Sequence, residues 1–190
     1  ELAAETGIST GFRRCGSITI ALTEERKQEI LRQASMARAF GVEVEEISAE
    51  EVARRYPHVN VEDVTAAVYL PKDGQGDPAN IALSLAKGAR KRGAQVIEGV
   101  KVTAIHQESG RVTAIDWERG EERGTITTDN VVNCAGMWGH HVGRMAGVNV
   151  PLQACEHFYI VTEGIDGLDQ LPVLRVPDEC AYYKEDAGKL

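Results

Sequence analysis

The stretch DGQGDPANIALSLAKGARKRGAQVIEGVKVTAI, residues 73–105, carries the strongest structural pattern in this 190-residue chain. Asp77 followed by Pro78 is typical of a helix start, because an N-cap carboxylate accepts hydrogen bonds from free backbone N–H groups and proline fits the first helical position. Gly93 suits the left-handed position just past a helix end. The apolar residues between them recur at helical spacing and are predicted to form the buried stripe: Ile81, Ala82, Leu83, Leu85, Ala86 and Ala89.

Short strands and a second helix are predicted after this helix. Alternating and β-branched residues predict strands over 95–100, 101–106, 111–117 and 125–128. Val131–Gly136 (VVNCAG) predicts a short buried strand that runs into a glycine, and a helix is expected over about 137–146.

The flanking segments are richer in strands. Before residue 73, strands or extended segments are predicted over 15–22, 42–47 and 66–70, and helices over about 23–40 and from the capping box at Ser48 to Tyr56. The first residues also read as helical. After Pro151, strands are expected over 154–162 and 180–184, joined by a loop through Leu171 and Pro172. An α/β unit is thus interleaved with an α+β unit, which predicts a discontinuous two-domain arrangement.

Composition narrows the class of partner. The formal net charge is −8, with Lys and Arg scattered along the chain, which disfavours nucleic acid and anionic membranes as partners. No apolar run is long enough for a transmembrane helix, and neither a signal peptide nor an initiator Met opens the chain. Four cysteines lie far apart without a C-x-x-C pair, so we expect reduced thiols packed as small apolar residues rather than two disulfides.

Two glycine motifs could approach a ligand. In 73–77 (DGQGD) two aspartates flank the glycines, Pro78 removes an N–H, and the third glycine of G-x-G-x-x-G is absent, so a turn with a helix cap is favoured over a phosphate loop. The strand end at 131–136, followed by Trp138, is open between two interpretations. It either lets backbone approach a cofactor or only provides a tight packing turn.

The histidines and tyrosines are individually weak signals. Adjacent residues on a helix diverge by ~100°, so His140 and His141 do not readily bind one metal, and no metal site is expected. Alternation along 154–162 puts His157 on one strand face, either as a hydrogen-bonded structural residue or as a catalyst. The pair Tyr182-Tyr183 is typical of a strand.

Taken in order, these motifs resemble a known family. The runs 73–105, 131–152 (VVNCAGMWGHHVGRMAGVNVPL), 154–163 (ACEHFYIVTE) and 171–175 (LPVLR) resemble dimethylglycine and sarcosine dehydrogenases, which belong to the D-amino-acid-oxidase-like flavoproteins. The resemblance covers essentially the whole chain. It implies an FAD-binding α/β domain, here 77–147, interleaved with an antiparallel-sheet substrate domain formed by 1–76 and 148–190.

The resemblance also implies roles for individual residues. Val102 matches a position whose backbone meets the adenine end of FAD. Ala135 and Gly136 match the turn that lies against the cofactor, with Trp138 just beyond. His157 and Tyr182 match active-site residues at the flavin's reactive face, although the register could move from Tyr182 to Tyr183. The implied reaction is hydride transfer to FAD from a small N-methyl amine such as sarcosine or dimethylglycine. The substrate carboxylate would need a cation, and Arg175 and Lys184 are both near in sequence.

Several family features are absent from residues 1–190. The G-x-G-x-x-G segment, the histidine that links covalently to flavin and the C-terminal folate-binding region are not in this sequence. We therefore expect an internal fragment that does not hold FAD or turn over by itself, with folate a partner of the longer protein. The implied location is cytoplasmic for a bacterial source and the mitochondrial matrix for a eukaryotic one.

A rival resemblance belongs to a different class of protein. The run ACEHFYIVTE also resembles the regulatory subunit of pyruvate dehydrogenase phosphatase, a non-catalytic relative in which the fold would be an interaction module. The runs around 76–99 and 142–152 resemble the sarcosine dehydrogenase side more closely, so the enzyme is the favoured interpretation.

Overall fold

The computed structural model describes residues 2–168 and 170–190. It divides the chain into two compact units, one made of Glu1–Gly93 with Tyr159–Leu190 and one made of Ala94–Phe158. Among the described residues, each unit contains both helices and strands, which confirms the mixed α/β and α+β class. Each unit is described by itself below.

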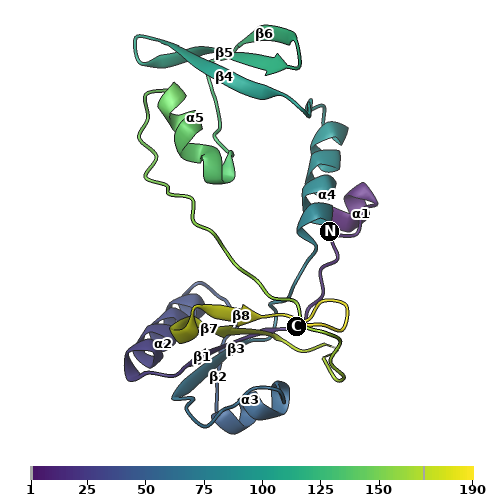
Figure 1. The fold of residues 1–190 in the computed structure, drawn as a ribbon, viewed down its shortest axis with the longest axis vertical. Coiled ribbons are helices and arrows are strands. Elements are labelled where there is room, and N and C mark those ends of the chain that lie inside the picture. The colour runs from purple at the N-terminus through teal and green to yellow at the C-terminus, as the bar shows by residue number, and fades with distance from the viewer. Residues whose placement is uncertain (1, 169) are drawn as a thin grey trace. The chain divides into compact units, whose positions relative to one another are not determined.

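A five-stranded mixed sheet is the centre of the first unit (Figure 1). The strand order is β2 (Glu45–Ile47), β3 (Ala66–Leu70), β1 (Ser17–Ala21), β7 (Val173–Val176) and β8 (Ala181–Tyr183). Neighbouring strands run antiparallel except β1 and β7, which run parallel. Residues 173–183 therefore complete a sheet that the N-terminal residues begin.

One helix covers each face of this sheet. Alternation along β1 and β3 sends Ile18, Ile20 and Ala67 toward α3 (Ala49–Arg55), where they pack with Val52 and Tyr56. Ala21 and Val68 point to the other face and pack with Ile30 and Ala34 of α2 (Glu24–Ala39).

Side-chain caps begin both helices, and the one at Ser48 confirms the predicted capping box. The Thr23 hydroxyl accepts from the Arg26 N–H, and the Ser48 hydroxyl accepts from the Glu51 N–H. Each cap satisfies one of the backbone donors that have no partner in the first helical turn.

The helix α4 (Pro78–Lys91) begins at the predicted cap, where Asp77 Oδ1 accepts from the N–H groups of Ala79 and Asn80 at 2.9 and 3.1 Å. Its predicted buried stripe is wrong. Of those six residues Leu83 and Leu85 are more than half exposed, and none is fully buried. The buried positions are instead Ser84 and Gly88. Because both residues are small, α1 (Leu2–Thr6) approaches this side of α4 closely, and the Thr6 and Ser84 hydroxyls form a hydrogen bond of 2.6 Å.

The second unit is a three-stranded antiparallel meander with a short helix against it. Its strands are β4 (Lys101–Glu108), β5 (Arg111–Arg119) and β6 (Glu122–Thr127), in that order. The turn η1 (Gly136–Trp138) leads into α5 (Gly139–Met145), which contacts β4. The core of this unit is thin, since among its described residues a single large apolar side chain, Ile105, is buried.

Two strands predicted in this unit do not form. Residues 95–100 and 131–134 lack regular secondary structure, and Val132 is 84% exposed. A strand needs a neighbour for its backbone hydrogen bonds, and no strand of the described residues pairs with either segment. Their apolar pattern is that of a buried strand, but the described chain provides no layer to cover it.

Two further expectations fail near the C-terminal end. Residues 173–176, assigned to a loop, form β7 in the interior of the sheet, because Leu174 and Val176 alternate with Arg175 between Pro172 and Pro177. The four cysteines are unpaired, but Cys134, Cys155 and Cys180 are exposed rather than packed.

Candidate functional site

The strand β8 presents its two tyrosines to opposite faces of the sheet. Tyr183 lies opposite Leu174 of β7 and packs against the core on the α3 side. Tyr182 lies opposite Arg175, which in turn lies opposite Thr19 of β1. Because residues paired across strands share a face, Thr19, Arg175 and Tyr182 form a row on the other face. We call this row the Arg175–Tyr182 face.

This row lies on the α2 side of the sheet, where α2 packs on β1 and β3, and it is open at β7 and β8. Tyr182 is 52% exposed, and the exposed Arg175 guanidinium makes no hydrogen bond or ion pair to any described residue. A guanidinium can donate two parallel hydrogen bonds to a carboxylate, and a phenol adds a third donor. The chemistry of this face therefore suits a small anion or the carboxylate of an amino acid.

His157 is not placed on a strand, which corrects the sequence prediction. Residues 151–160 are exposed and have no helix or strand, and His157 belongs to the unit Ala94–Phe158 whereas Tyr182 belongs to the other. The strand expected over 154–162 does not form, so His157 is not part of the sheet that holds Tyr182. The physical reason is that no described strand pairs with 154–162, so its alternating pattern has no ladder to join.

The turn predicted to lie against the cofactor, at Ala135 and Gly136, is partly exposed at the end of a loop. The Asn133 side chain holds it, since its Oδ1 accepts from the Ala135 N–H at 3.2 Å and its Nδ2 donates to the Gly139 carbonyl at 2.8 Å. Gly136 has φ +52° with no atom within 4 Å of where a Cβ would lie. Trp138 is 63% exposed. Exposed backbone beside an exposed indole fits the close approach of a flat ligand.

Val102 lies on an edge strand of the meander. It pairs with Trp117 of β5, and the register shifts between Val102 and Ala104. Among the described residues β4 pairs only with β5, so its outer edge keeps backbone N–H and C=O groups that can bond a planar ligand edge. Since α5 contacts β4 and η1 leads directly into α5, the cofactor positions predicted in this unit belong to adjoining elements.

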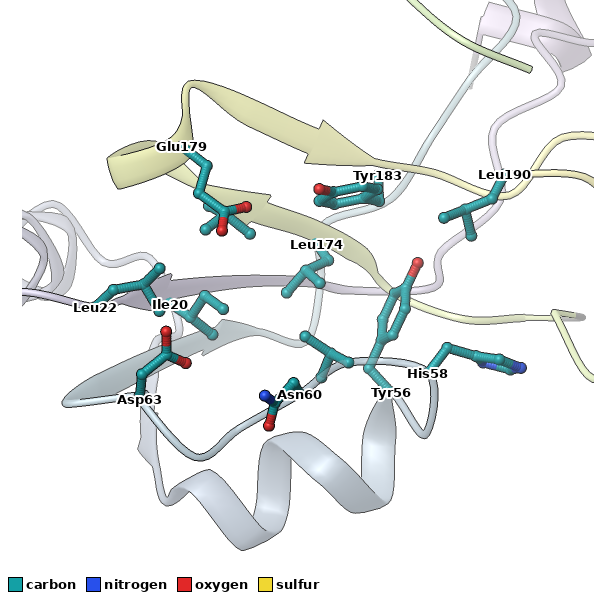
Figure 2. A pocket seen from close by; sticks show the side chains of 12 residues that line it. Ile20, Leu22, Tyr56, His58, Asn60, Asp63, Leu174, Glu179, Tyr183 and Leu190 are labelled. Atoms are coloured by element: carbon teal, nitrogen blue, oxygen red, sulfur yellow. The ribbon is translucent and has the colours of Figure 1, made fainter. Parts of the chain in front are cut away.

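A pocket of about 350 Å³ lies on the α3 side of the five-stranded sheet (Figure 2). Its apolar wall comes from β1 and β7 and includes Ile20, Leu174 and Val176. Its polar groups come from Tyr56, His58, Asn60, Asp63, Glu179 and Tyr183. Burial, with the nearby Tyr183 as the lesser cause, raises the pKa of Tyr56 to about 12, so its hydroxyl stays protonated.

The histidine pair of α5 does not form a metal centre. The rings of His140 and His141 stack with centroids 3.7 Å apart, and burial with the neighbouring His141 and Arg144 lowers the pKa of His140. Within the described residues no group of three or more His, Cys, Asp or Glu side chains could hold a metal ion.

Two residues, Arg175 and Tyr56, gain a place in a site only from the structure. Sequence reasoning did not choose between Arg175 and Lys184, and the register Arg175 to Tyr182 was hidden because β7 was assigned to a loop. The alternation of Val173–Val176 between two prolines is the signal that could have found it. Tyr56 was noted only as a helix end, and its place in a pocket depends on the packing of distant strands.

Comparisons with known proteins agree with this architecture. The family model for FAD dependent oxidoreductases (DAO) matches residues 1–190. Mouse sarcosine dehydrogenase, a mitochondrial protein, is 41% identical over 97% of the chain. Human mitochondrial dimethylglycine dehydrogenase is 33% identical over all of the chain, and the mouse mitochondrial pyruvate dehydrogenase phosphatase regulatory subunit is 36% identical over 87% of it. The chain spans about a fifth of the length of these relatives (20%, 22% and 19%).

Solved structures share the fold. The L-proline dehydrogenase of P. horikoshii superimposes with a TM-score of 0.78 at 23% identity, covering 99% of this chain and 50% of that one. Glycine oxidase from Geobacillus kaustophilus gives 0.74 at 25% identity, covering 98% and 48%. None of the helices in the described part of the chain has the length and hydrophobicity to cross a membrane. The match of the family model to every residue carries the assignment: the chain belongs to the FAD-dependent oxidoreductase family of D-amino-acid-oxidase-like flavoproteins.

Proposed function

We propose that this chain is part of a flavin-dependent amine oxidoreductase that demethylates a small N-methyl amine such as sarcosine or dimethylglycine. The observation that carries the proposal is the 41% identity to sarcosine dehydrogenase across 97% of the chain. Identity at this level over both units supports a shared reaction type more strongly than a shared fold does. We also propose that residues 77–147 belong to the FAD-binding domain and that 1–76 and 148–190 belong to the substrate domain.

The Arg175–Tyr182 face is proposed as the substrate side. The Arg175 guanidinium would hold the substrate carboxylate, and the Tyr182 hydroxyl, on the same face, would orient the amine end. Arg175 is preferred over Lys184 because it lies directly across from Tyr182 in the β7–β8 register. His157, in the second unit, is proposed on the family resemblance as a group that favours the neutral amine.

The second unit is proposed to hold FAD. The open edge of β4 at Val102 would bond the adenine end, and the exposed turn at Ala135 and Gly136 would lie against the cofactor with Trp138 beside it. When bound, FAD supplies the acceptor for the hydride that leaves the N-methyl group. The residues of this chain would bind, orient and shield the amine, which must be neutral to release hydride. A folate acceptor for the one-carbon product remains a proposal about the longer protein.

A second candidate is a non-catalytic role like that of the pyruvate dehydrogenase phosphatase regulatory subunit. The 36% identity over 87% of the chain supports it, but both the identity and the coverage are lower than for sarcosine dehydrogenase. In that case the open face would bind a protein or a small effector without chemistry.

Anaerobic reduction of the flavin separates the two candidates. In the full-length protein loaded with FAD, sarcosine or dimethylglycine is expected to bleach the oxidised flavin absorbance, and the product is expected to include the demethylated amine. If a series of N-methyl amines leaves the flavin oxidised while dithionite still reduces it, the enzymatic proposal fails and the regulatory role is favoured.

A further inference from the structure

The pocket on the α3 side of the sheet is separate from the face proposed for the substrate. Tyr182 and Tyr183 are consecutive on β8, so their side chains point to opposite faces, and Tyr183 lines the pocket. At about 350 Å³ the pocket lies in the range of ~300–1,000 Å³ that is usual for small-molecule sites. All of its lining residues belong to the first unit.

The hydroxyl of Tyr56 is the first sign that the pocket takes a ligand. Tyr56 is 2% exposed, and its Oη is buried without a hydrogen-bond partner in the described chain. Figure 2 shows this hydroxyl directed between Tyr183 and Leu190, which line the same pocket. Because a buried donor without a partner destabilises a protein by ~1–3 kcal/mol, a native fold normally gives it an acceptor.

The charges around the pocket define the other end of the ligand. Asp63 and Glu179 line it from the side opposite Tyr56, and neither has a hydrogen bond or ion pair to a described residue. No Lys or Arg is among the lining residues, and His58 is the remaining titratable group that is basic. Two carboxylates without a cation favour a positively charged guest.

We propose that this pocket binds a small aliphatic ammonium ion that carries a hydrogen-bond acceptor at its far end, as an ω-amino acid does. The acceptor takes the Tyr56 hydroxyl, the aliphatic middle lies on Ile20, Leu174 and Val176, and the ammonium group lies between Asp63 and Glu179. The site is an accessory one on the back of the sheet, and it does not depend on the proposed function. Through β8 its occupant would contact the same strand that presents Tyr182.

Calorimetric titration of the purified protein tests the proposal with a series of probes: 4-aminobutanoate, 5-aminopentanoate and 6-aminohexanoate. At least one is expected to bind saturably, with hexanoate and hexylamine at least ~10-fold weaker because each lacks one charged end. Tyr56→Phe keeps the ring and is expected to weaken binding ~10-fold, which corresponds to the loss of one hydrogen bond worth ~1.4 kcal/mol.

Matched variants locate the ammonium group. The double change Asp63→Asn with Glu179→Gln is expected to weaken binding of the ω-amino acid ~10-fold or more and to leave hexanoate binding unchanged. Glu62→Gln, an exposed carboxylate beside Asp63 that does not line the pocket, should bind like the wild type. Tyr182→Phe, on the other face, should also bind like the wild type.

Three outcomes would overturn the proposal. They are no saturable binding of any probe at millimolar concentration, equal affinity for the wild type and Tyr56→Phe, or loss of binding in Tyr182→Phe but not in Tyr56→Phe. The last would assign the binding to the substrate face. Loss of flavin reduction without loss of probe binding would instead contradict the proposed function alone.

Discussion

Tyr56 combines full burial with a hydroxyl that finds no acceptor in the described chain. In the absence of ligand, Tyr56→Phe is therefore expected to raise the free energy of unfolding by about 1 kcal/mol, because it removes the buried donor and keeps the ring. Urea unfolding followed by circular dichroism measures the change. Tyr56→Ala is the contrasting variant and should lose ~3 kcal/mol or more, since it leaves a cavity under α3.

A ligand of the pocket would reverse the order of stability of the wild type and Tyr56→Phe. With saturating ω-amino acid, wild type should gain stability and Tyr56→Phe should gain less, because binding stabilises only the folded state that holds the ligand. A lower stability of Tyr56→Phe without ligand would mean that the hydroxyl already has a partner, such as an ordered water.

Arg175 is proposed to bind the substrate carboxylate, and on that proposal it distinguishes substrates that carry one from those that do not. In the FAD-loaded full-length protein, Arg175→Met is expected to raise the KM for sarcosine ~10- to 100-fold, as the loss of a charged hydrogen bond of ~1.5–3 kcal/mol requires. Steady-state kinetics with sarcosine and with an N-methyl amine that lacks a carboxylate measure the effect. The second substrate should lose little with Arg175→Met.

Arg32→Gln is the control for that experiment. Arg32 is an exposed arginine of α2 whose guanidinium has no hydrogen bond to a described residue, so its loss should leave both substrates unaffected. Equal losses for the two substrates in Arg175→Met would show that Arg175 does not bind the carboxylate.

Among the elements, α4 and α5 each place a glycine where a helix meets its neighbour, with different room for a side chain. A Cβ at Gly88 of α4 would meet only Thr6 Cγ2 at 3.5 Å, an ordinary contact. A Cβ at Gly143 of α5 would come within 2.6 Å of Val150 Cγ2 and 3.0 Å of the Val148 carbonyl oxygen. Gly88→Ala should therefore stabilise α4 by up to about 1 kcal/mol through helix propensity.

Gly143→Ala is the matched variant with the opposite sign. It should destabilise α5 by ~1–3 kcal/mol, because the segment 148–150 would have to move away. Amide hydrogen exchange, read separately on α4 and α5, measures both changes. Slower exchange in α5 of Gly143→Ala would contradict the close packing of that helix.

The elements also show how far sequence patterns reach. The helix caps at Ser48 and Asp77 were predicted correctly because they depend on residues a few positions apart. The strand 66–70 was predicted correctly at both ends, whereas the strands predicted at 131–136 and 154–162 were wrong. A strand's pattern reports the burial it is suited to, but its formation needs partners elsewhere in the chain.

The same limit applies to the candidate site. Individual residues such as Tyr182 could be selected from sequence through a family resemblance. Their neighbours could not, because the row of Thr19, Arg175 and Tyr182 joins three strands drawn from both ends of the chain. The buried stripe of α4 failed for a related reason, since small residues determine where α1 packs.

At the scale of the whole molecule, two carboxylates join segments that are distant in sequence. Asp178 accepts from the Leu22 N–H and the Thr23 hydroxyl, both at 3.0 Å, and so ties the β7–β8 turn to the start of α2. Glu185 accepts from the Gly188 N–H and from Arg13. These hydrogen bonds, that of Leu22 first for Asp178 and that of Gly188 first for Glu185, lower the pKa of each carboxyl.

These lowered pKa values predict a loss of stability in acid. A carboxyl whose folded pKa lies below its unfolded value stabilises the fold fully above the unfolded value and loses this contribution as the pH falls through the folded one. The urea midpoint should therefore decrease between about pH 5 and pH 3. The double change Asp178→Asn with Glu185→Gln should flatten this decrease, and Glu62→Gln, on an exposed carboxylate, should not.

The segment 148–161 gives the last prediction, because it joins the two compact units without regular structure. It is exposed almost throughout, with Phe158, Tyr159 and Ile160 each more than 80% exposed. Backbone that is not held in a helix or strand opens easily to a protease, so chymotrypsin should cut the isolated 190-residue chain first at Phe158 or Tyr159. Mass spectrometry of the first fragments identifies the bond.

The same bond in the full-length protein distinguishes two explanations of the alternating pattern at 154–162. If that pattern is suited to a strand and lacks only its partners here, the longer protein loaded with FAD should resist cleavage at Phe158 and Tyr159. Cleavage at the same rate in both proteins would mean that the segment stays extended and unpaired, and His157 would then have no rigid position from which to orient an amine. Protection in the longer protein would restore the strand predicted from the sequence, with His157 and Tyr159 on one of its faces.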